Sequence, residues 1–399
     1  MNFLERIFGE HHDGDRIYMD YAAATPLRHE VWEAMRPLYR DVFGNPSAIH
    51  KEGQRARRLI ESARESVARQ LQIRAEDVIF TSGGTEANNL AIGGVIEALR
   101  VSGRDYHDME IVTTALEHPS VIRVCEQLAT RGVQIHEAPV DEDGRMKMTE
   151  FEKLLSEKTV VVVTALINSE IGVLQDTRKL KRLMNEHAKQ AVLIVDGAQA
   201  PLWESCQLEK IGADILTLDA GKFYGPKGVG ALARRHGVLI APVTHGGGQE
   251  NNLRPGTENL APIVGFDVAF TIAQANRGRR SEGVGQLRNY FFEKITELPQ
   301  AVINGSTEHR VANNVNISIP GLDTEFAAVV LDEHDVACST KSACSGAGGG
   351  QSKVVMTISG DAARATSTLR FTLGETSNKE EIDVVIKILK EHIEKMQKV

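Results

Sequence analysis

Short apolar runs rich in β-branched residues alternate with amphipathic stretches between residues 77 and 233. The runs cover Asp77–Thr81, Glu110–Thr114, Val160–Ile167, Ala191–Val195, Ile215–Leu218 and Gly228–Ala233. Several of these runs are apolar throughout instead of alternating, which is typical of strands that are buried on both faces of a sheet. Strand–helix alternation of this kind predicts an α/β fold in which helices wrap a mainly parallel sheet.

The pattern changes after Pro262, where longer helical stretches are separated by a few short strands. The spacing of apolar residues predicts a helix over Gly283–Leu298. Strands are predicted at Asn314–Ile319 and Thr368–Thr372. A last helix is predicted from apolar residues at helical spacing, which are Ile382, Ile386, Leu389, Ile393 and Met396. Ser377 and Glu380 predict a capping box at its start.

This change of pattern predicts two domains. We expect a large domain at 16–261 and a smaller α+β domain at 262–399. Residues 1–15 are a candidate for packing on the smaller domain. The sequence contains no internal repeat that would favour a solenoid instead.

Composition and charge are those of a globular enzyme. Hydrophobic residues make up 42% and charged residues 25%, which excludes wholesale disorder. A net charge of −8 leaves no basic surface suited to direct nucleic-acid binding. The longest apolar run, around Val160–Ile167, is too short to cross a bilayer, and Met1–Glu10 lacks the apolar core of a signal peptide. These features predict a cytoplasmic protein without a membrane partner.

The chain has four cysteines and no pair spaced as CxxC. They are Cys125, Cys206, Cys338 and Cys344. This pattern indicates neither a disulfide framework nor a zinc site. We therefore expect a reducing compartment and no bound metal.

Polar residues follow several of the predicted strands at their carboxyl ends. They are Thr81–Thr85, His118, Asn168–Glu170, Asp196 with Gln199, and Asp219–Lys222. Each one alone is equally typical of a helix cap or a turn. Ligands of open α/β sheets bind at the carboxyl ends of the strands, so five such groups at one edge favour a binding site.

Three of these groups have chemistry that fits one cofactor. The Ser82–Thr85 turn offers backbone N–H groups at a helix start, which suits phosphate, although an ordinary helix cap would look the same. Asp196 is a carboxylate close to a buried strand end, where an unpaired charge is costly and a cationic partner is expected. Lys222 lies at the sheet edge, where desolvation favours a neutral amine that can form a Schiff base. Pyridoxal phosphate requires all three.

The residues between about Ile17 and Ile393 resemble the cysteine desulfurase family, class V of the aspartate-aminotransferase-like enzymes of pyridoxal phosphate fold type I. The motifs that carry the resemblance follow the order of the family. They are MDYAAATP at Met19–Pro26, FGNPSAIH at Phe43–His50, FTSGGTEANNLAI at Phe80–Ile92, LEHPSV at Leu116–Val121, INSEIGVLQD at Ile167–Asp176, VDGAQ at Val195–Gln199, GKFYGPKGVGAL at Gly221–Leu232, HGGGQE at His245–Glu250, RPGTEN at Arg254–Asn259, SAC at Ser342–Cys344 and LRFTLG at Leu369–Gly374.

The resemblance implies pyridoxal 5′-phosphate as the cofactor. Lys222 would hold it as a Schiff base, and Asp196 would pair with the pyridinium nitrogen. Gln199 would contact the ring hydroxyl, and His118 would lie on the ring face and move protons. Further cofactor contacts would come from Gly84, Thr85, Ser169 and, from the neighbouring subunit of a homodimer, Thr257.

The resemblance also implies the substrate and the fate of its sulfur. Arg370, assisted by Asn45, would bind the carboxylate of L-cysteine. Cys344 would take up the sulfur as a persulfide, L-alanine would leave, and an acceptor such as an iron–sulfur scaffold protein would receive the sulfur for cluster or thiolated-RNA synthesis. Cys125, Cys206 and Cys338 are expected to be packing residues.

The sequence departs from the family pattern at the phosphate site. The family usually has Ser and His three positions and one position before the Schiff-base lysine, where this chain has Asp219 and Gly221. A carboxylate about 4 Å from a phosphate costs on the order of 4 kcal/mol per charge pair at an effective dielectric of about 20. We therefore expect Asp219 to point away or to be neutralised by a cation such as Lys227, and weakened cofactor binding is the remaining alternative.

Other departures leave further readings open. Ala24 replaces a usual threonine, Lys341 replaces a glycine near Cys344, and Ser169 stands where an asparagine is usual. A selenocysteine lyase, or another lyase that uses pyridoxal phosphate, would carry a similar set of residues. A degenerate relative that serves as an interaction subunit is the alternative outside the enzymes.

Overall fold

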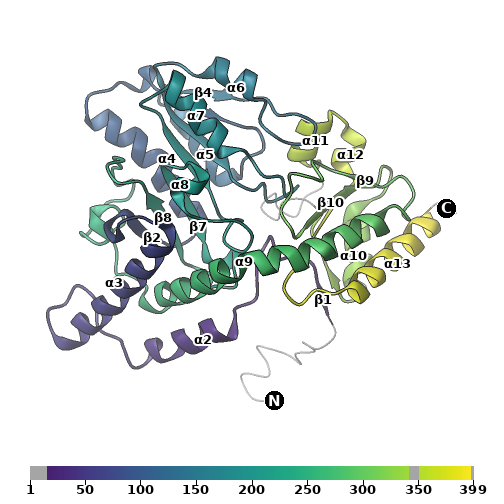
Figure 1. Ribbon diagram of the computed structural model, residues 1–399, viewed down its shortest axis with the longest axis horizontal. Coiled ribbons are helices and arrows are strands. Elements are labelled where there is room, and N and C mark those ends of the chain that lie inside the picture. The colour runs from purple at the N-terminus through teal and green to yellow at the C-terminus, as the bar shows by residue number, and fades with distance from the viewer. Residues whose placement is uncertain (1–15, 341–349, 397–399) are drawn as a thin grey trace.

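A seven-stranded sheet forms the centre of the larger lobe of the computed structural model, which describes residues 16–340 and 350–396 (Figure 1). The strand order is β2-β8-β7-β6-β5-β3-β4. The strands are β2 (Val78–Thr81), β3 (Glu110–Thr113), β4 (Gln134–Glu137), β5 (Thr159–Ala165), β6 (Val192–Asp196), β7 (Ile215–Asp219) and β8 (Gly230–Arg234). Only β8 runs antiparallel to its neighbours in this sheet, so the predicted mainly parallel α/β fold is confirmed.

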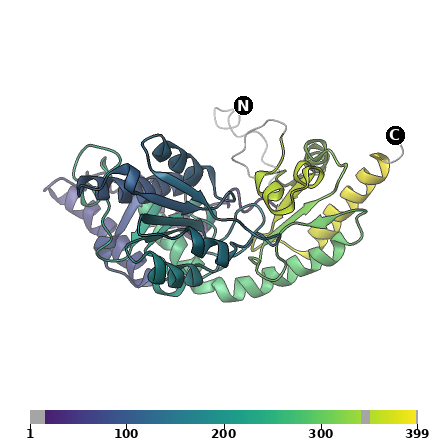
Figure 2. The same ribbon diagram turned by 90° about the horizontal axis from the view of Figure 1, so that it is seen from above.

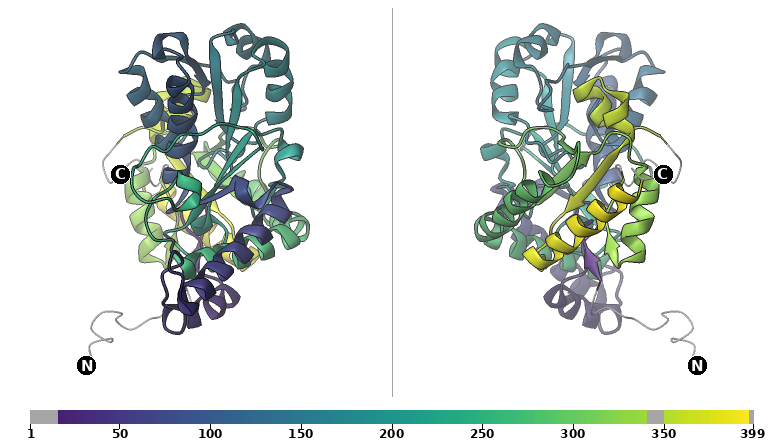
Figure 3. Two further views of the ribbon diagram at one scale, coloured as in Figure 1. Left: turned by 90° about the vertical axis from the view of Figure 1, so that its left-hand side faces the viewer. Right: turned by 90° about the vertical axis from the view of Figure 1, so that its right-hand side faces the viewer.

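The apolar runs form strands because helices cover both faces of the sheet (Figure 3). On one face, Val161 and Val163 of β5 pack with α4 (Gly84–Val101) and α5 (Pro119–Ala129). On the other face, Val162 belongs to the core formed with the remaining large helices. Those helices are α3 (Lys51–Leu71), α7 (Thr177–His187) and α9 (Leu260–Ile295).

The smaller lobe contains a three-stranded antiparallel sheet of order β12-β10-β9. Its strands are β9 (Val302–Ile303), β10 (Asn314–Ser318) and β12 (Thr368–Thr372), and its helices are α10 (Thr324–Glu333), α11 (Lys353–Ser359), α12 (Ala362–Thr366) and α13 (Lys379–Met396). The first described strand, β1 (Ile17–Tyr18), pairs in parallel with β11 (Val336–Ala337). The start of the described chain therefore belongs to the smaller lobe, although the sequence assigns residue 16 onward to the large domain. Residues 1–15 lie outside the described residues.

Helix α9 runs along both lobes, as Figure 2 shows. The helix predicted over Gly283–Leu298 is only its C-terminal part, so the predicted start is wrong. The N-terminal half escaped prediction because it is apolar on most sides and has no polar stripe. Its Phe266 ring packs edge-on against Phe223 at 5.3 Å between centroids and stacks on Phe270 at 5.9 Å.

The shorter helices lie between these elements. They are α2 (His29–Met35), α6 (Met148–Leu154), α8 (Leu208–Ile211) and the 3₁₀ helices η1 (Arg36–Tyr39), η2 (Ala75–Asp77), η3 (Tyr106–Asp108), η4 (Ala220–Lys222) and η5 (Glu250–Asn252). Within 16–340 and 350–396, none of the helices is long and apolar enough to cross a membrane.

The capping box of α13 lies one residue later than predicted. Asn378 Oδ1 accepts a hydrogen bond from Glu381 N at 2.9 Å, and Glu381 Oε2 accepts one from Asn378 N at 3.3 Å. Ser377 instead belongs to the preceding turn, where its Oγ accepts from Gly374 N at 3.0 Å. The prediction of Ser377 and Glu380 is therefore wrong in register, because a neighbouring pair of residues satisfies the same pattern.

A buried ion pair anchors the strand that leads into the site. Arg64 of α3 donates to both carboxylate oxygens of Glu250 at 2.7 and 2.8 Å, and also to the carbonyl oxygen of Val78 at 2.7 Å. Glu250 also accepts from Phe80 N at 2.9 Å. Both side chains are buried, so each charge depends on the other for compensation. The pair ties β2 to α3 and to the loop after β8.

Candidate active site

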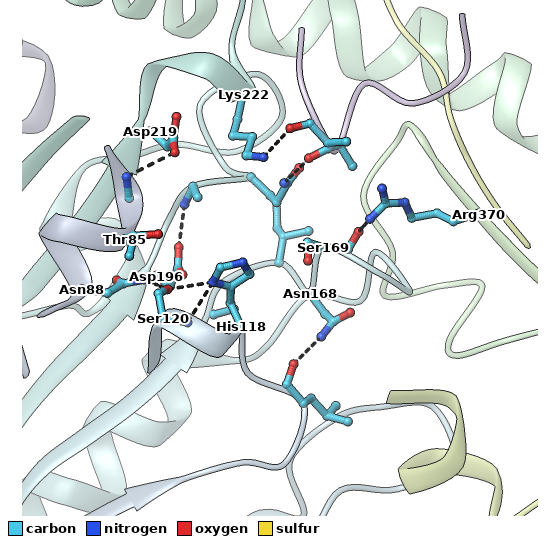
Figure 4. Close-up of a pocket in the computed structure, with 18 residues that line it drawn as sticks. Thr85, Asn88, His118, Ser120, Asn168, Ser169, Asp196, Asp219, Lys222 and Arg370 are labelled. Carbon is cyan, nitrogen blue, oxygen red and sulfur yellow. Dashed lines mark hydrogen bonds between the residues drawn. The ribbon is translucent and has the colours of Figure 1, made fainter. Parts of the chain in front are cut away.

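A cavity lies where the carboxyl ends of β5, β6 and β7 meet the starts of α4 and α5, with β12 of the smaller lobe on its other side (Figure 4). The structure brings together at its wall the predicted residues Gly84, Thr85, His118, Ser169, Asp196, Gln199, Lys222 and Arg370. Asn45 and Thr257 do not line it, and Cys344 lies outside the described residues. The cavity thus collects residues from both lobes and from seven separate stretches of the sequence.

Asp196, the last residue of β6, is held by neutral donors. Asn88 Nδ2 donates to its Oδ2 at 2.9 Å, and Ala198 N donates to its Oδ1 at 2.9 Å. Thr217 in turn donates to Asn88 Oδ1 at 2.6 Å, which fixes the orientation of the amide. The carboxylate is buried, and no lysine or arginine of the described residues forms an ion pair with it. This arrangement leaves Asp196 suited to a cationic ligand.

Asn88 was not predicted as a site residue. It lies in α4, one turn after the glycines that begin the helix, and connects Asp196 to Ser120 by a second hydrogen bond of 2.9 Å. The sequence gives no signal for this role, because the contact depends on α4 packing beside β6 and α5.

His118 caps the start of α5. Its Nδ1 accepts from Ser120 N at 3.1 Å and lies 2.7 Å from Ser120 Oγ. Because Nδ1 accepts a backbone hydrogen bond, the neutral imidazole carries its proton on Nε2. The cap therefore fixes both the ring and its tautomer at the cavity wall.

Glu117, the residue before His118, is a buried carboxyl group that the sequence reasoning missed. It accepts hydrogen bonds from Thr114 Oγ1 at 2.7 Å, Thr164 Oγ1 at 3.0 Å and Ala165 N at 2.7 Å. Burial raises the pKa of Glu117 to about 7 against these hydrogen bonds, and the nearby charge of Asp196 adds to the rise. An acid in the short connection between the apolar strand β3 and α5 was the available signal in the sequence.

Lys222 ends the η4 turn after β7. Its Nζ donates to the carbonyl oxygen of Ala23, and among the residues that the structure describes no carboxylate pairs with it. The segment that contains Ala23 is tied to the η4 turn, because Thr25 donates to the carbonyl oxygen of Gly221 through both its N, at 2.9 Å, and its Oγ1, at 3.0 Å. The amine is thereby presented to the cavity without a counter-ion.

Asp219 occupies the turn expected to bind phosphate. Its Oδ2 accepts from Gly84 N at 3.2 Å, and its Oδ1 accepts from Gly221 N at 2.9 Å. The expectation that Asp219 points away, or is neutralised by Lys227, is therefore wrong: Lys227 Nζ donates to the carbonyl oxygen of Thr25 at 2.5 Å, and no cationic side chain in the described ranges pairs with Asp219. The physical reason is local, since aspartate at a helical N-cap is drawn to the free N–H groups of the turn.

Arg370 brings β12 to the cavity. Its Nη1 donates to the carbonyl oxygen of Ser169 at 3.0 Å, and its Nη2 donates to Asp20 Oδ1 at 2.8 Å. The side chain is buried, and its Nε has no hydrogen-bond partner among the described residues. Asp20, which the sequence did not single out, therefore sets the direction of the guanidinium.

The three cysteines of the described chain are buried or partly buried. Burial raises the pKa of the Cys125 and Cys338 thiols to about 12, and raises that of Cys206 further. A thiol with so high a pKa has almost no thiolate at neutral pH and is a poor nucleophile. The three therefore behave as packing residues, as expected.

Comparison with known sequences matches almost the whole chain. The family model described as aminotransferase class-V matches residues 17–385. A protein of Dictyoglomus turgidum named cysteine desulfurase IscS is 38% identical over 96% of this chain and 95% of its own length. One from Archaeoglobus fulgidus, named cysteine desulfurase IscS 1, is 35% identical over 95% of this chain and 97% of its own.

Comparison with solved structures agrees with the sequence matches. A structure described as a NifS-like protein superposes with a TM-score of 0.88 at 31% identity, over 95% of this chain and all of its own. A structure described as SspA in complex with cysteine superposes with a TM-score of 0.76 at 29% identity, over 90% of this chain and 98% of its own.

Proposed function

This chain belongs to the aminotransferase class-V family and, within it, to the cysteine desulfurases, and from that premise we propose that it passes sulfur from L-cysteine to Cys344 and releases L-alanine. The observation that carries the assignment of roles is the convergence of Lys222, Asp196, His118 and Arg370 on one cavity. A role as a helix cap or in a structural ion pair would explain any one of these residues, but it would not explain why all four line the same cavity.

The ring-binding part of the cavity fits pyridoxal 5′-phosphate by the chemistry of its side chains. Asp196 is a buried carboxylate whose described neighbours supply no cation, which suits a pyridinium nitrogen, and Lys222 offers an amine for the aldehyde. When bound, the cofactor supplies an electron sink for the carbanion formed when the Cα proton leaves. Gln199 would hold the ring hydroxyl, with Ser169 beside it and Gly84 and Thr85 at the phosphate end.

The side chains of the cavity would bind the substrate and transfer the protons. Arg370, oriented by Asp20, would bind the substrate carboxylate, which places the Cα–H bond near Lys222. The Lys222 amine would take the Cα proton. His118, with its proton on Nε2, would donate a proton to the departing product, while Asn88 keeps Asp196 in place.

We assign the sulfur-accepting role to Cys344, although it lies outside the described residues. The backbone of Ser339 exchanges two hydrogen bonds with that of Arg370, at 2.7 and 3.1 Å. Cys344 follows five residues later, and at roughly 3.4 Å per residue its reach from Ser339 is at most about 17 Å. The same length of chain allows it to approach a substrate held by Arg370.

We further propose that the protein is a homodimer. Tyr39, Phe43 and Ile49 are 59%, 80% and 90% exposed, which is unusual for large apolar side chains on a free surface. Asn45 lies in the same stretch, and Thr257 is exposed and does not line its own cavity. A second copy that covers this surface would let the partner's Thr257 complete the phosphate site. Replacing Phe43 and Ile49 by aspartate should give a monomer by light scattering.

The sulfur acceptor that we propose is a protein such as an iron–sulfur scaffold, in the cytoplasm. The three described cysteines are free thiols, which fits a reducing compartment. Mixing persulfide-loaded protein with a candidate scaffold and following the transfer of labelled sulfur would test the acceptor.

The central test is the reaction itself. Purified protein with pyridoxal 5′-phosphate and L-cysteine should form alanine and a protein persulfide. Cys344→Ala should abolish the persulfide, and Lys222→Ala should abolish the visible absorption of the bound cofactor. A preference for selenide release from selenocysteine would favour the lyase alternative. A protein without Lys222-dependent absorption at saturating cofactor would be the non-catalytic relative.

A further inference from the structure

The Asp219 carboxylate binds backbone donors of two segments that meet at the cavity. One oxygen accepts from Gly84 N at the start of α4, and the other accepts from Gly221 N in the η4 turn after β7. Both donors belong to glycines, and only at Gly221 would a side chain be tight against the carboxylate. A Cβ built on Gly84 would lie 3.4 Å from Asp219 Oδ2, and one on Gly221 would lie 3.2 Å from Oδ1.

From this geometry we propose that Asp219 is an internal anion that competes with the cofactor phosphate for the N–H groups of Gly84 and Gly221, so that the cofactor is held weakly and exchanges readily. The inference rests on the proposed function, because it concerns the same cavity. It assigns to Asp219 a specific effect on cofactor affinity.

No positively charged side chain of the described residues offsets the negative charge of Asp219. No cationic side chain within residues 16–340 or 350–396 pairs with Asp219. Two lysines are near the turn in the chain, but neither ammonium group is bonded to Asp219: Lys222 donates to the carbonyl oxygen of Ala23, and Lys227 donates to that of Thr25. Glu86, in the first turn of α4, adds a second carboxylate, although Arg254 pairs with it at 2.9 Å. The start of α4 therefore already has two carboxylates, those of Asp219 and Glu86, beside it.

The size of the effect follows from the separation of the charges. A phosphate bound to the same N–H groups would lie within about 4 Å of the carboxylate. At an effective dielectric near 20, the repulsion between the two would lower the affinity for the phosphate by roughly a thousandfold. Rotation of Asp219 away from the donors relieves part of it and leaves those donors to the phosphate. We expect removal of the charge to tighten cofactor binding by about 10- to 1000-fold.

Two variants and one control test the proposal. Asp219→Asn keeps the shape and removes the charge, and Asp219→Ser keeps a helix-capping hydroxyl. Asp105→Asn is the matched control, since Asp105 caps η3 through an equivalent 2.9 Å hydrogen bond from His107 N far from the cavity. The dissociation constant of pyridoxal 5′-phosphate is measured by its absorption on each cofactor-free protein. Both Asp219 variants should bind at least tenfold more tightly than the parent, and the control should be unchanged.

A second measurement separates this inference from the proposed function. Inorganic phosphate should raise the Tm of the cofactor-free Asp219 variants more than that of the parent, whether or not Lys222 reacts with an aldehyde. Equal phosphate shifts in all proteins, or weaker cofactor binding by the Asp219 variants, would overturn the inference. Larger phosphate shifts without any Lys222-dependent absorption would support the inference and refute the proposed function.

Discussion

The buried carboxyl group of Glu117 should make the stability of this protein fall as the pH rises. Its pKa is raised from 4.5 to about 7, chiefly by burial. In the unfolded chain the group ionises near its ordinary pKa, whereas in the folded protein it stays protonated up to about pH 7. The folded state thus binds more protons between these two values, and the linkage relation requires that stability is lost over this range.

The magnitude follows from the two pKa values. Each unit of difference corresponds to about 1.4 kcal/mol, so the full loss amounts to about 3 kcal/mol and is complete above about pH 7. Glu117→Gln removes the ionisation but can keep the hydrogen bonds with Thr114, Thr164 and Ala165, because the threonine hydroxyls can turn to accept from the amide. The free energy of unfolding of the variant, relative to the parent, should therefore rise by about 3 kcal/mol between about pH 4.5 and pH 7.5.

Urea unfolding of the cofactor-free proteins across this pH range measures the difference directly. Glu137→Gln serves as the control, because Glu137 is an exposed carboxylate at the end of β4, and its difference from the parent should stay flat. If the Glu117→Gln difference is equally flat, burial does not shift this carboxyl group and the reasoning fails.

Three further predictions follow from the contacts. Glu250→Ala should lower the free energy of unfolding by about 3–5 kcal/mol in urea titrations, because it leaves a buried guanidinium with only the longer ionic contact to the exposed carboxylate of Glu61, whereas Glu61→Ala should cost under about 1 kcal/mol. Asn88→Ala should weaken binding of pyridoxal 5′-phosphate by roughly 10- to 100-fold in absorption titrations, because the Asp196 carboxylate loses a donor, and Asn89→Ala should not. Arg370→Lys should raise the KM for L-cysteine by about tenfold or more in alanine assays with the cofactor absorption unchanged, because lysine cannot bind the carboxylate through two parallel hydrogen bonds.

If Glu250→Ala and Glu61→Ala lower the free energy of unfolding equally, then burial of the Arg64–Glu250 pair does not add to its effect on stability. For Asn88→Ala, unchanged cofactor binding would mean that Ala198 N alone orients Asp196. A loss of kcat without a change in KM would contradict the role given to Arg370.

The sequence predicted the sheet well where strands are buried on both faces. β5 consists mainly of valine because helices cover both of its faces, and its composition therefore predicts its burial. β4 was missed because it lies at the edge of the sheet and has exposed ends, so its residues form no apolar run. The start of α9 was missed for the opposite reason, since a helix that is apolar on most sides has no stripe to detect.

Local pattern alone predicted the site residues that lie at strand ends, whereas Arg370, within β12, was predicted only through the family resemblance. Asp196 ends β6 and Lys222 lies in the turn after β7, and the structure brings both to one cavity. Asn88 and Asp20 act by touching segments that are distant in the chain, and no local pattern reports such contacts. The orientation of Asp219 also depended on where α4 approaches the turn after β7, which is a property of packing.

Because α9 is continuous across both lobes, it limits where the chain can be cut and how the lobes can move relative to one another. A helix of 36 residues is about 54 Å long, and cutting the protein at residue 261 would remove nearly all of it from the sheet that it covers. A fragment ending there would expose the ring cluster around Phe223 and should aggregate. A change in the angle between the two lobes would bend this helix. Gly278 and Gly283, which have no neighbour where a Cβ would lie, are where the least resistance to bending is expected.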